Sequence, residues 1–234
     1  MPRSKLSLAI LLPAYNEAQV IVSTIKGIKK VLRQQSLIKS KIIVIDDGSQ
    51  DSTLKLAKNH ADVVIHHPLN RGLGAALATG LEYVKRHPEI KYAVSFDSDG
   101  QHHPQDILKA IKALNRGFDI VIGSRFLNPK NKIPFTRKLV LKLSNLLTFI
   151  FFGLWTSDSQ SGFRAFNRQA IEAIKLSTNR MEVSSEFFSE IKARKLKFTE
   201  IPISVKYTSY SVSKGQSNLN SFNILVKLIY KLFK

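Results

Sequence analysis

The first 124 residues alternate between short apolar runs and longer amphipathic segments, and this alternation constrains the fold more than any other feature. Continuous apolar runs indicate strands that are buried on both faces, and periodic segments between them indicate helices. We therefore predict an α/β protein with a Rossmann-like, mostly parallel central sheet and helices on both faces. The expected strands are residues 6–13, 41–47, 62–67, 91–97 and 118–124, and the expected helices are residues 17–35, opened by Asn16, 51–60, capped by Ser49 or Asp51, 72–87, and a segment after Pro104.

Polar motifs follow each of these expected strands. Ligands of parallel sheets bind beyond the carboxyl ends of the strands, and those ends meet at one edge. We therefore expect five polar segments to converge on a single site. They are residues 13–17, 46–51, 70–74, 97–102 and 123–125.

The second half of the chain is less regular. Residues 138–155 are a candidate apolar helix that contains Lys138 and Lys142, and its uncharged part is shorter than the roughly 20 residues needed to span a bilayer. Residues 182–195 predict a further helix, and residues 198–207 predict an edge strand that Pro202 interrupts.

The C-terminal residues 220–234 predict a short amphipathic helix. Lys227, Lys231 and Lys234 recur at spacings of four and three, so they share one helical face. This helix either lies in a membrane interface, with its lysines toward anionic headgroups, or covers the sheet as an ordinary docking helix. No linker divides the chain into independent domains.

The chain is strongly basic, with 36 Lys and Arg against 17 Asp and Glu, a formal net charge of +19. Such a balance favours polyanionic partners such as nucleic acid, anionic lipid or phosphorylated substrates. No nucleic-acid-binding signature is present, which makes nucleic acid the least favoured of the three. The absence of cysteine excludes disulfides and a Cys-based zinc site.

Asp97 and Asp99 follow the fourth expected strand and are separated by one residue. On an extended chain they point to the same side, where like charges repel unless a cation lies between them. A solvated turn is the alternative, because Asp, Ser and Gly are common turn formers. Helix capping is likewise an alternative for Asn16, Ser49 and Asp51. Gly72 and Gly74 either permit close backbone approach to a ligand or form a helix-start turn.

Taken together, the motifs PAYNE, IDDGSQDST, NRGLGAALATG, DSDGQH, GSRF and SGFRAF resemble, in this order, those of family 2 glycosyltransferases with the GT-A fold. The similarity spans about residues 6–205 and is greatest to the polyprenyl-phosphate branch, the dolichyl-phosphate mannose and glucose synthases. It implies an inverting transferase that uses a nucleotide-diphosphate sugar of the GDP-mannose or UDP-glucose type and a divalent cation, Mg²⁺ or Mn²⁺.

The same resemblance assigns residues. The implied metal site is Asp97, Asp99 and Gln101. The implied catalytic set is Asp99, Asp158, Arg125 and Arg164, with a positioning role for Asp158 favoured over base catalysis. The implied nucleotide-sugar pocket comprises Pro13, Tyr15, Asn16, Glu17, Asp46, Asp47, Gly74, Asp97 and Ser98.

The implied acceptor is polyprenyl (dolichyl or undecaprenyl) phosphate, whose phosphate would be held by Arg125, Arg137 and Lys214. Lys214 precedes the Gly of a lid motif that departs here from the family pattern. Residues 1–219 would then be the catalytic domain, with residues 206–219 as its lid. The resemblance also implies peripheral attachment to the cytoplasmic face of a membrane with an anionic surface, and a small membrane-protein subunit as a further partner.

Two other functions fit some of these features. A family 2 enzyme that acts on a polysaccharide or another glycan would need a general base for its acceptor hydroxyl, so it differs from the first reading at Asp158. A non-catalytic basic binding module would not need complete metal and nucleotide motifs.

Overall fold

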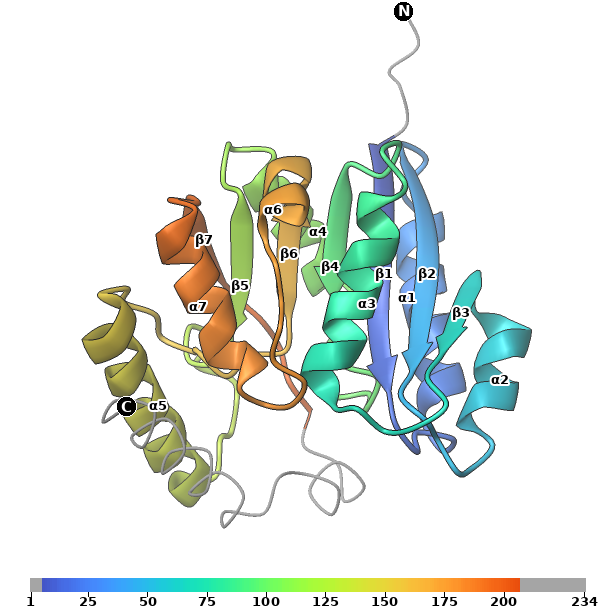
Figure 1. Ribbon diagram of the computed structural model, residues 1–234, viewed down its shortest axis with the longest axis horizontal. Helices are drawn as coiled ribbons and strands as arrows, with labels where there is room; N and C mark the ends of the chain where they lie inside the picture. Colours follow the sequence, from blue (N-terminus) through green and yellow to red (C-terminus); the bar gives the residue numbers. More distant parts are fainter. Residues whose placement is uncertain (1–5, 207–234) are drawn as a thin grey trace, which may run out of the picture.

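The computed structural model describes residues 6–206 and consists of one seven-stranded sheet between two layers of helices (Figure 1). The strand order is β3-β2-β1-β4-β6-β5-β7. All neighbouring pairs are parallel except those of β6, which is antiparallel to both β4 and β5. The strands are β1 (Leu6–Ala14), β2 (Ile38–Asp46), β3 (Val63–His66), β4 (Tyr92–Ser95), β5 (Ile120–Ser124), β6 (Arg164–Asn167) and β7 (Phe198–Pro202).

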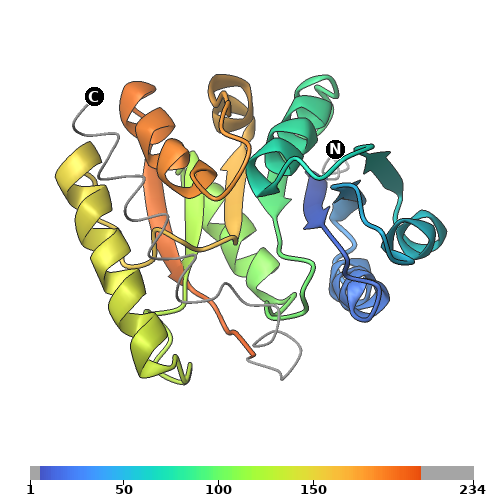
Figure 2. The same ribbon diagram turned by 60° about the horizontal axis from the view of Figure 1, so that its bottom comes forward.

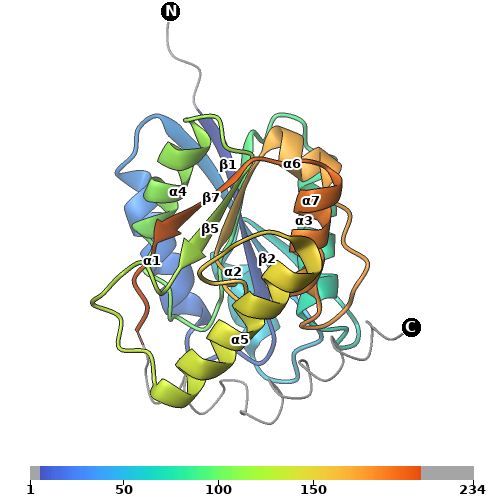
Figure 3. The same ribbon diagram turned by 90° about the vertical axis from the view of Figure 1, so that its left-hand side faces the viewer.

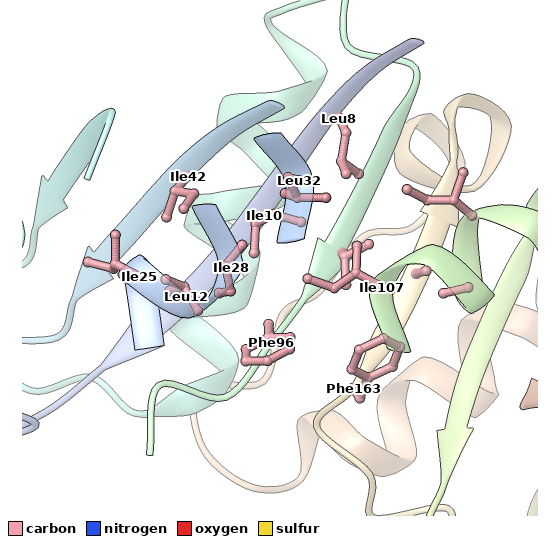
Figure 4. Close-up of a cluster of buried hydrophobic side chains, with 14 of the residues drawn as sticks. Leu8, Ile10, Leu12, Ile25, Ile28, Leu32, Ile42, Phe96, Ile107 and Phe163 are labelled. Atoms are coloured by element: carbon pink, nitrogen blue, oxygen red, sulfur yellow. The ribbon is translucent and has the colours of Figure 1, made fainter. Parts of the chain in front are cut away.

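Helices cover both faces of the sheet, as the alternating sequence predicts (Figures 1 and 3). On one face α1 and α4 bury an apolar cluster against β1, and Figure 4 shows Ile25 and Ile28 of α1 beside Leu12. On the other face α3, α6 and α7 bury a second cluster. The helices are α1 (Ile21–Arg33), α2 (Thr53–His60), α3 (Leu73–Lys85), α4 (Asp106–Leu114), α5 (Phe135–Phe152), α6 (Arg168–Ala173) and α7 (Val183–Ala193).

The main departure from the expected fold is β6, which comes from the SGFRAF motif. This strand has four residues, one of them an arginine, so it lacks the apolar run by which the other strands are recognised. It lies between β4 and β5 and pairs with both. The motif therefore crosses the centre of the sheet. The short helix α6 directly after it was also not expected.

The start of α1 corrects a second expectation. The helix begins at Ile21, and Asn16 does not cap it. Instead Asn16 adopts a left-handed backbone conformation, with φ 54°, and its Oδ1 accepts a hydrogen bond from Gln50 N at 2.8 Å. Ser49 Oγ accepts a hydrogen bond from Asn16 N at 2.9 Å, so Ser49 does not cap α2. Asp51 Oδ1 accepts a hydrogen bond at 2.9 Å from the backbone N of Thr53, the first residue of α2. The motifs after β1 and β2 thus bind each other across neighbouring strand ends.

Two expectations about the second half are confirmed. β7 lies at the edge of the sheet and ends at Pro202. Within residues 6–206, no helix is both long and apolar enough to cross a membrane. The predicted lid at 206–219, except its first residue, and the predicted helix at 220–234 lie outside the described residues.

Candidate active site

The polar motifs of the first half gather at the carboxyl ends of the parallel strands, the edge that comes forward in Figure 2. Direct hydrogen bonds join neighbouring motifs there. Ser98 Oγ donates to Pro13 O at 2.7 Å, and Asp47 N donates to Ala14 O at 2.8 Å. Glu17 N donates to Thr53 Oγ1 at 2.7 Å. The motifs after β1, β2 and β4 therefore form one continuous surface, and Tyr15 is exposed on it.

Asp46 and Asp47 are both buried and each is paired with a histidine of the neighbouring segment. His66 Nδ1 lies 2.7 Å from Asp46 Oδ2, and His67 Nδ1 lies 2.8 Å from Asp47 Oδ1. Asp46 Oδ1 is buried without a hydrogen-bond partner among the described residues. An unsatisfied buried acceptor is costly, so this oxygen is suited to receive an N–H or O–H group of a ligand.

Asp47 organises the following loop. Its carboxylate accepts hydrogen bonds from Gly72 N at 2.6 Å and from Arg71 N at 3.1 Å, in addition to its contact with His67. We therefore assign Asp47 the role of shaping the loop that opens α3. A direct contact of Asp47 with a nucleotide stays a prediction.

Gly74 has a structural reason to lack a side chain. A Cβ at this position would lie 2.0 Å from Thr178 O, which belongs to the loop before α7. The same loop accepts a hydrogen bond from Ala75 N through Asn179 O at 3.1 Å. The close approach that Gly74 permits is thus made by this loop, and contact of Gly74 with a sugar donor stays a prediction.

The carboxylates of the DSDGQH motif differ in their surroundings. His102 Nε2 lies 2.9 Å from Asp97 Oδ2. Burial alone would raise the pKa of Asp97, but this hydrogen bond and nearby positive charges, including Arg125 and Arg164, hold the pKa below its ordinary value. Burial and the charge of Asp97 raise the pKa of Asp99 to about 6. The two carboxylates therefore repel each other.

These residues fit a divalent cation. The donor set consists of hard carboxylate oxygens, which suit Mg²⁺ and Mn²⁺, and a cation would relieve the repulsion that raises the pKa of Asp99. Residues 6–206 contain no group of three or more His, Cys, Asp or Glu side chains placed to hold a metal ion. Two carboxylates that share an ion with substrate phosphates are a common arrangement for Mg²⁺. The side chain of Gln101 as a third ligand stays a prediction.

His102 has a partner that sequence reasoning did not foresee. It forms an isolated antiparallel bridge with Val205, and Lys206 N donates to Gln101 O at 2.9 Å. The segment after β7 therefore runs alongside the metal motif, at the point where the predicted lid begins.

Arg125 and Asp158 form a buried ion pair. Arg125 Nε donates to Asp158 Oδ2 at 2.6 Å and its Nη2 donates to Asp158 Oδ1 at 2.5 Å, while Arg125 N also donates to Oδ2 at 3.0 Å. Asp158 is fully buried and Arg125 is 7% exposed. A carboxylate that takes three hydrogen bonds from one arginine holds that arginine in place, and a role of Asp158 in sugar transfer stays a prediction.

Arg164, which the resemblance places in the catalytic set, is almost fully buried. It is 2% exposed, its Nη2 donates to Ser159 O at 3.0 Å, and its guanidinium lies 4.4 Å from the centre of the Phe187 ring. Burial lowers the pKa of Arg164 to about 10. We therefore infer a supporting role, in which the positive charge of Arg164 helps to lower the pKa of Asp97. Arg137 lies in the first turn of α5, and Lys214 lies outside the described residues; their roles toward an acceptor stay predictions.

This fold and site define a glycosyltransferase of the GT-A type. The sequence pattern of the family described as Glycosyl transferase family 2 matches residues 9–175, and the chain belongs to that family.

The chain is also similar to individual proteins. It is 34% identical to the UDP-N-acetylglucosamine–dolichyl-phosphate N-acetylglucosaminyltransferase of Methanococcus voltae, over 94% of each chain. It is 30% identical to the polyprenol monophosphomannose synthase of Mycolicibacterium smegmatis, over 72% of this chain and 64% of that one. A crystal structure of glucosyl-3-phosphoglycerate synthase from Mycobacterium tuberculosis with Mn²⁺, uridine diphosphate and glucosyl-3-phosphoglycerate shares the fold, with a TM-score of 0.66 and 19% identity over 95% of this chain and 80% of that one.

Proposed function

We propose that this glycosyltransferase moves a sugar from a nucleotide-diphosphate donor to polyprenyl phosphate at the cytoplasmic face of a membrane. The observation that carries the proposal is the convergence of charges at Asp97: burial alone would raise the pKa of this carboxyl, but its hydrogen bond with His102 and the nearby charges of His102, Arg125 and Arg164 hold the pKa below its ordinary value. A carboxylate site for a metal-bound diphosphate and a cationic site for a second anion therefore adjoin. The names of two relatives, which include dolichyl phosphate and polyprenol, support a lipid phosphate as that second anion.

On the donor side, Asp97 and Asp99 would hold the divalent ion. When bound, the ion neutralises the charge that develops on the leaving diphosphate. Asp46 would receive a polar hydrogen of the nucleotide through its unpaired Oδ1, and the Asp47-bound loop would support the diphosphate near the first turn of α3.

On the acceptor side, a lipid phosphate is already anionic and needs no strong general base. Asp158 is fully buried and engaged by Arg125 through both oxygens, which suits a positioning residue rather than a base. This arrangement favours a phosphate acceptor over the glycan hydroxyl of the alternative family 2 reading, which would require a base. A non-catalytic binding module is set aside by the family assignment.

The identity of the transferred sugar is the most specific element of the proposed function. The relatives are named for N-acetylglucosamine and mannose, so UDP-N-acetylglucosamine joins GDP-mannose and UDP-glucose as a candidate donor. Calorimetry with UDP and GDP, each with Mg²⁺, Mn²⁺ or a chelator, tests the donor side. We expect one nucleotide to bind in a metal-dependent manner; equal binding with the chelator would contradict the metal role.

Helix α5 supports the membrane part of the proposal. Its apolar face, defined as Phe135, Leu139, Leu143, Leu146, Phe149 and Ile150, is exposed, whereas Leu141, Asn145 and Thr148 face the protein. The spacing of three and four residues places the apolar face on one side of the helix. Trp155 follows and is 67% exposed. Five basic and no acidic residues occur between residues 126 and 157, which is complementary to anionic lipid.

We therefore expect α5 to lie on an anionic bilayer surface, beside the loop that carries Asp158. Trp155 is the only tryptophan of the chain and reports on this contact. Its fluorescence emission should shift to shorter wavelength on addition of phosphatidylglycerol vesicles and much less with phosphatidylcholine, because apolar burial and lysine attraction act together. Leu139→Glu should weaken vesicle binding about tenfold or more, since burying one leucine contributes about 1.5–3 kcal/mol.

The control is Leu37→Glu, an exposed leucine directly before β2, at the amino end of that strand. It should bind vesicles like the unchanged protein. An unshifted Trp155 emission would contradict the contact of α5 with the bilayer. A dimer in lipid-free solution that Leu139→Glu dissociates would show that the apolar face of α5 binds a second copy of the chain instead. Contributions from residues 220–234 and from a small membrane subunit stay predictions.

A further inference from the structure

Glu200 lies in β7 and accepts several hydrogen bonds from the loop before Asp158. Its Oε1 accepts from Thr156 Oγ1 at 2.7 Å, from Ser157 N at 2.9 Å and from Ser157 Oγ at 3.0 Å. Its Oε2 also lies 3.1 Å from Ser157 N. A carboxylate can accept this many bonds because it has two oxygens and no hydrogens. Glu200 therefore fixes the side chains of Thr156 and Ser157 and the backbone of Ser157.

The fixed loop is joined directly to the end of β5. Ser157 Oγ lies 2.6 Å from Ser124 Oγ, and the next residue on each side forms the buried pair of Arg125 and Asp158. Glu200 is opposite Ile122 in the parallel pairing of β5 with β7. Two adjacent cross-links, one of hydroxyls and one of charges, thus connect the strand end to the loop, and Glu200 anchors them from the neighbouring strand.

Helix α5 holds the same loop from another side. Asn145 Nδ2 donates to Ser157 O at 2.6 Å, and Asn145 Oδ1 accepts from Ser159 N at 2.8 Å. The loop backbone is therefore already tied to α5 on both sides of Asp158. Glu200 adds a restraint from β7, which holds the loop beside the end of β5, directly before Arg125.

We propose that Glu200 is a positioning residue for sugar transfer. By fixing residues 156–157, it places Asp158 so that this carboxylate directs the Arg125 guanidinium toward the acceptor phosphate. The identity of the acceptor rests on the proposed function, whereas the placement of Arg125 does not.

Glu186 provides a matched control, because its carboxylate does the same for a different loop. It accepts hydrogen bonds from the backbone and side chains of Ser177 and Thr178. That loop contacts the first turn of α3 through Thr178 and Asn179 and is not joined to Arg125 by any of these bonds. Loss of Glu186 should therefore spare the acceptor side.

The experiment compares Glu200→Ala, Glu200→Gln and Glu186→Ala in transfer to polyprenyl phosphate. Glu200→Ala should raise the KM for the lipid phosphate about tenfold or more, because several bonds to a charged group are lost, and should leave the KM for the nucleotide sugar unchanged. Glu200→Gln keeps one acceptor oxygen and should recover most of the loss. Glu186→Ala should leave the KM for lipid phosphate unchanged.

An NMR measurement tests the placement of Arg125 without any acceptor. The Nε–H signal of Arg125, assigned by its absence in Arg125→Lys, should be protected from exchange in the unchanged protein, in Glu200→Gln and in Glu186→Ala, and should lose protection in Glu200→Ala. If Glu200→Ala does not fold, Ser157→Ala takes its place, because it removes the hydroxyl shared by Ser124 and Glu200.

The proposal would be overturned if the Arg125 Nε–H stayed protected in folded Glu200→Ala, or in Ser157→Ala where that variant takes its place. Equal rises in the KM values of donor and acceptor in the same variant would also overturn it. Failure of the unchanged protein to use polyprenyl phosphate would instead overturn the proposed function, and the NMR signal would still decide the role of Glu200.

Discussion

Replacing Asp99 by Asn should abolish sugar transfer and leave the protein folded. Asp99 is a proposed ligand of the ion that stabilises the leaving diphosphate, and losing such a charge contact should cost several kcal/mol of transition-state stabilisation. Turnover should then fall by roughly a thousandfold or more, since each 1.36 kcal/mol is tenfold in rate. Because burial and Asp97 raise the pKa of Asp99 to about 6, the charge is unfavourable in the fold. Its removal should not lower the melting temperature.

Steady-state transfer rates with saturating Mg²⁺ or Mn²⁺, together with thermal melts, check this prediction. Asp97→Ala should also abolish transfer, but it should lower stability as well, because it removes the partner of buried His102. Asp106→Asn, at the start of α4, is a control carboxylate outside the metal motif. Near-normal turnover of Asp99→Asn with saturating metal would show that Asp99 is not a ligand.

Removing Asp158 should damage both the fold and the activity. The Arg125–Asp158 pair is buried, and deleting one member of such a pair leaves an unpaired charge at a cost of about 3–5 kcal/mol. Asp158→Ala should therefore lower the melting temperature by about 6–20 °C for a chain of this size. Arg125→Ala should have a similar effect, because it strands the carboxylate instead. Thermal or denaturant unfolding measures both.

A double variant separates stability from function in this pair. Arg125→Met with Asp158→Leu replaces both charges by apolar side chains, which is often neutral or stabilising for a buried ion pair. It should recover most of the stability lost in either single variant, yet it should not transfer sugar, because the acceptor phosphate would lack its arginine. If the double variant regained activity along with stability, the pair would be structural only.

Much of the fold was predictable because it depends on local patterns. The parallel strands β1 to β5 are apolar runs, and the rule that their carboxyl ends meet at one edge predicts that the motifs after β1, β2 and β4 converge. What was missed depends on long-range pairing. β6 is too short and too polar to be recognised locally, and it inserts between strands that come earlier in the chain.

The same distinction holds in the site. The carboxylates were found because they occur in recognisable motifs, but their partners follow from strand register. His66 is opposite Asp46 in the pairing of β2 with β3, and the adjacent sequence pairs Asp46-Asp47 and His66-His67 were the only signal. Glu200 gave no signal, because its loop partners are more than 40 residues away in sequence. Gly74 faces a carbonyl from a loop about 100 residues later, which no local pattern indicates.

Transfer of radiolabelled sugar to purified polyprenyl phosphate is the most direct test of the central claim. UDP-N-acetylglucosamine, GDP-mannose and UDP-glucose would each be incubated with the protein, Mg²⁺ or Mn²⁺, and either polyprenyl phosphate, the unphosphorylated polyprenol or a soluble glycan. We predict that one donor gives a labelled, lipid-extractable product with polyprenyl phosphate, that a chelator or Asp99→Asn abolishes it, and that polyprenol gives none. Label transferred to polyprenol or to the glycan, with none on polyprenyl phosphate, would contradict the account.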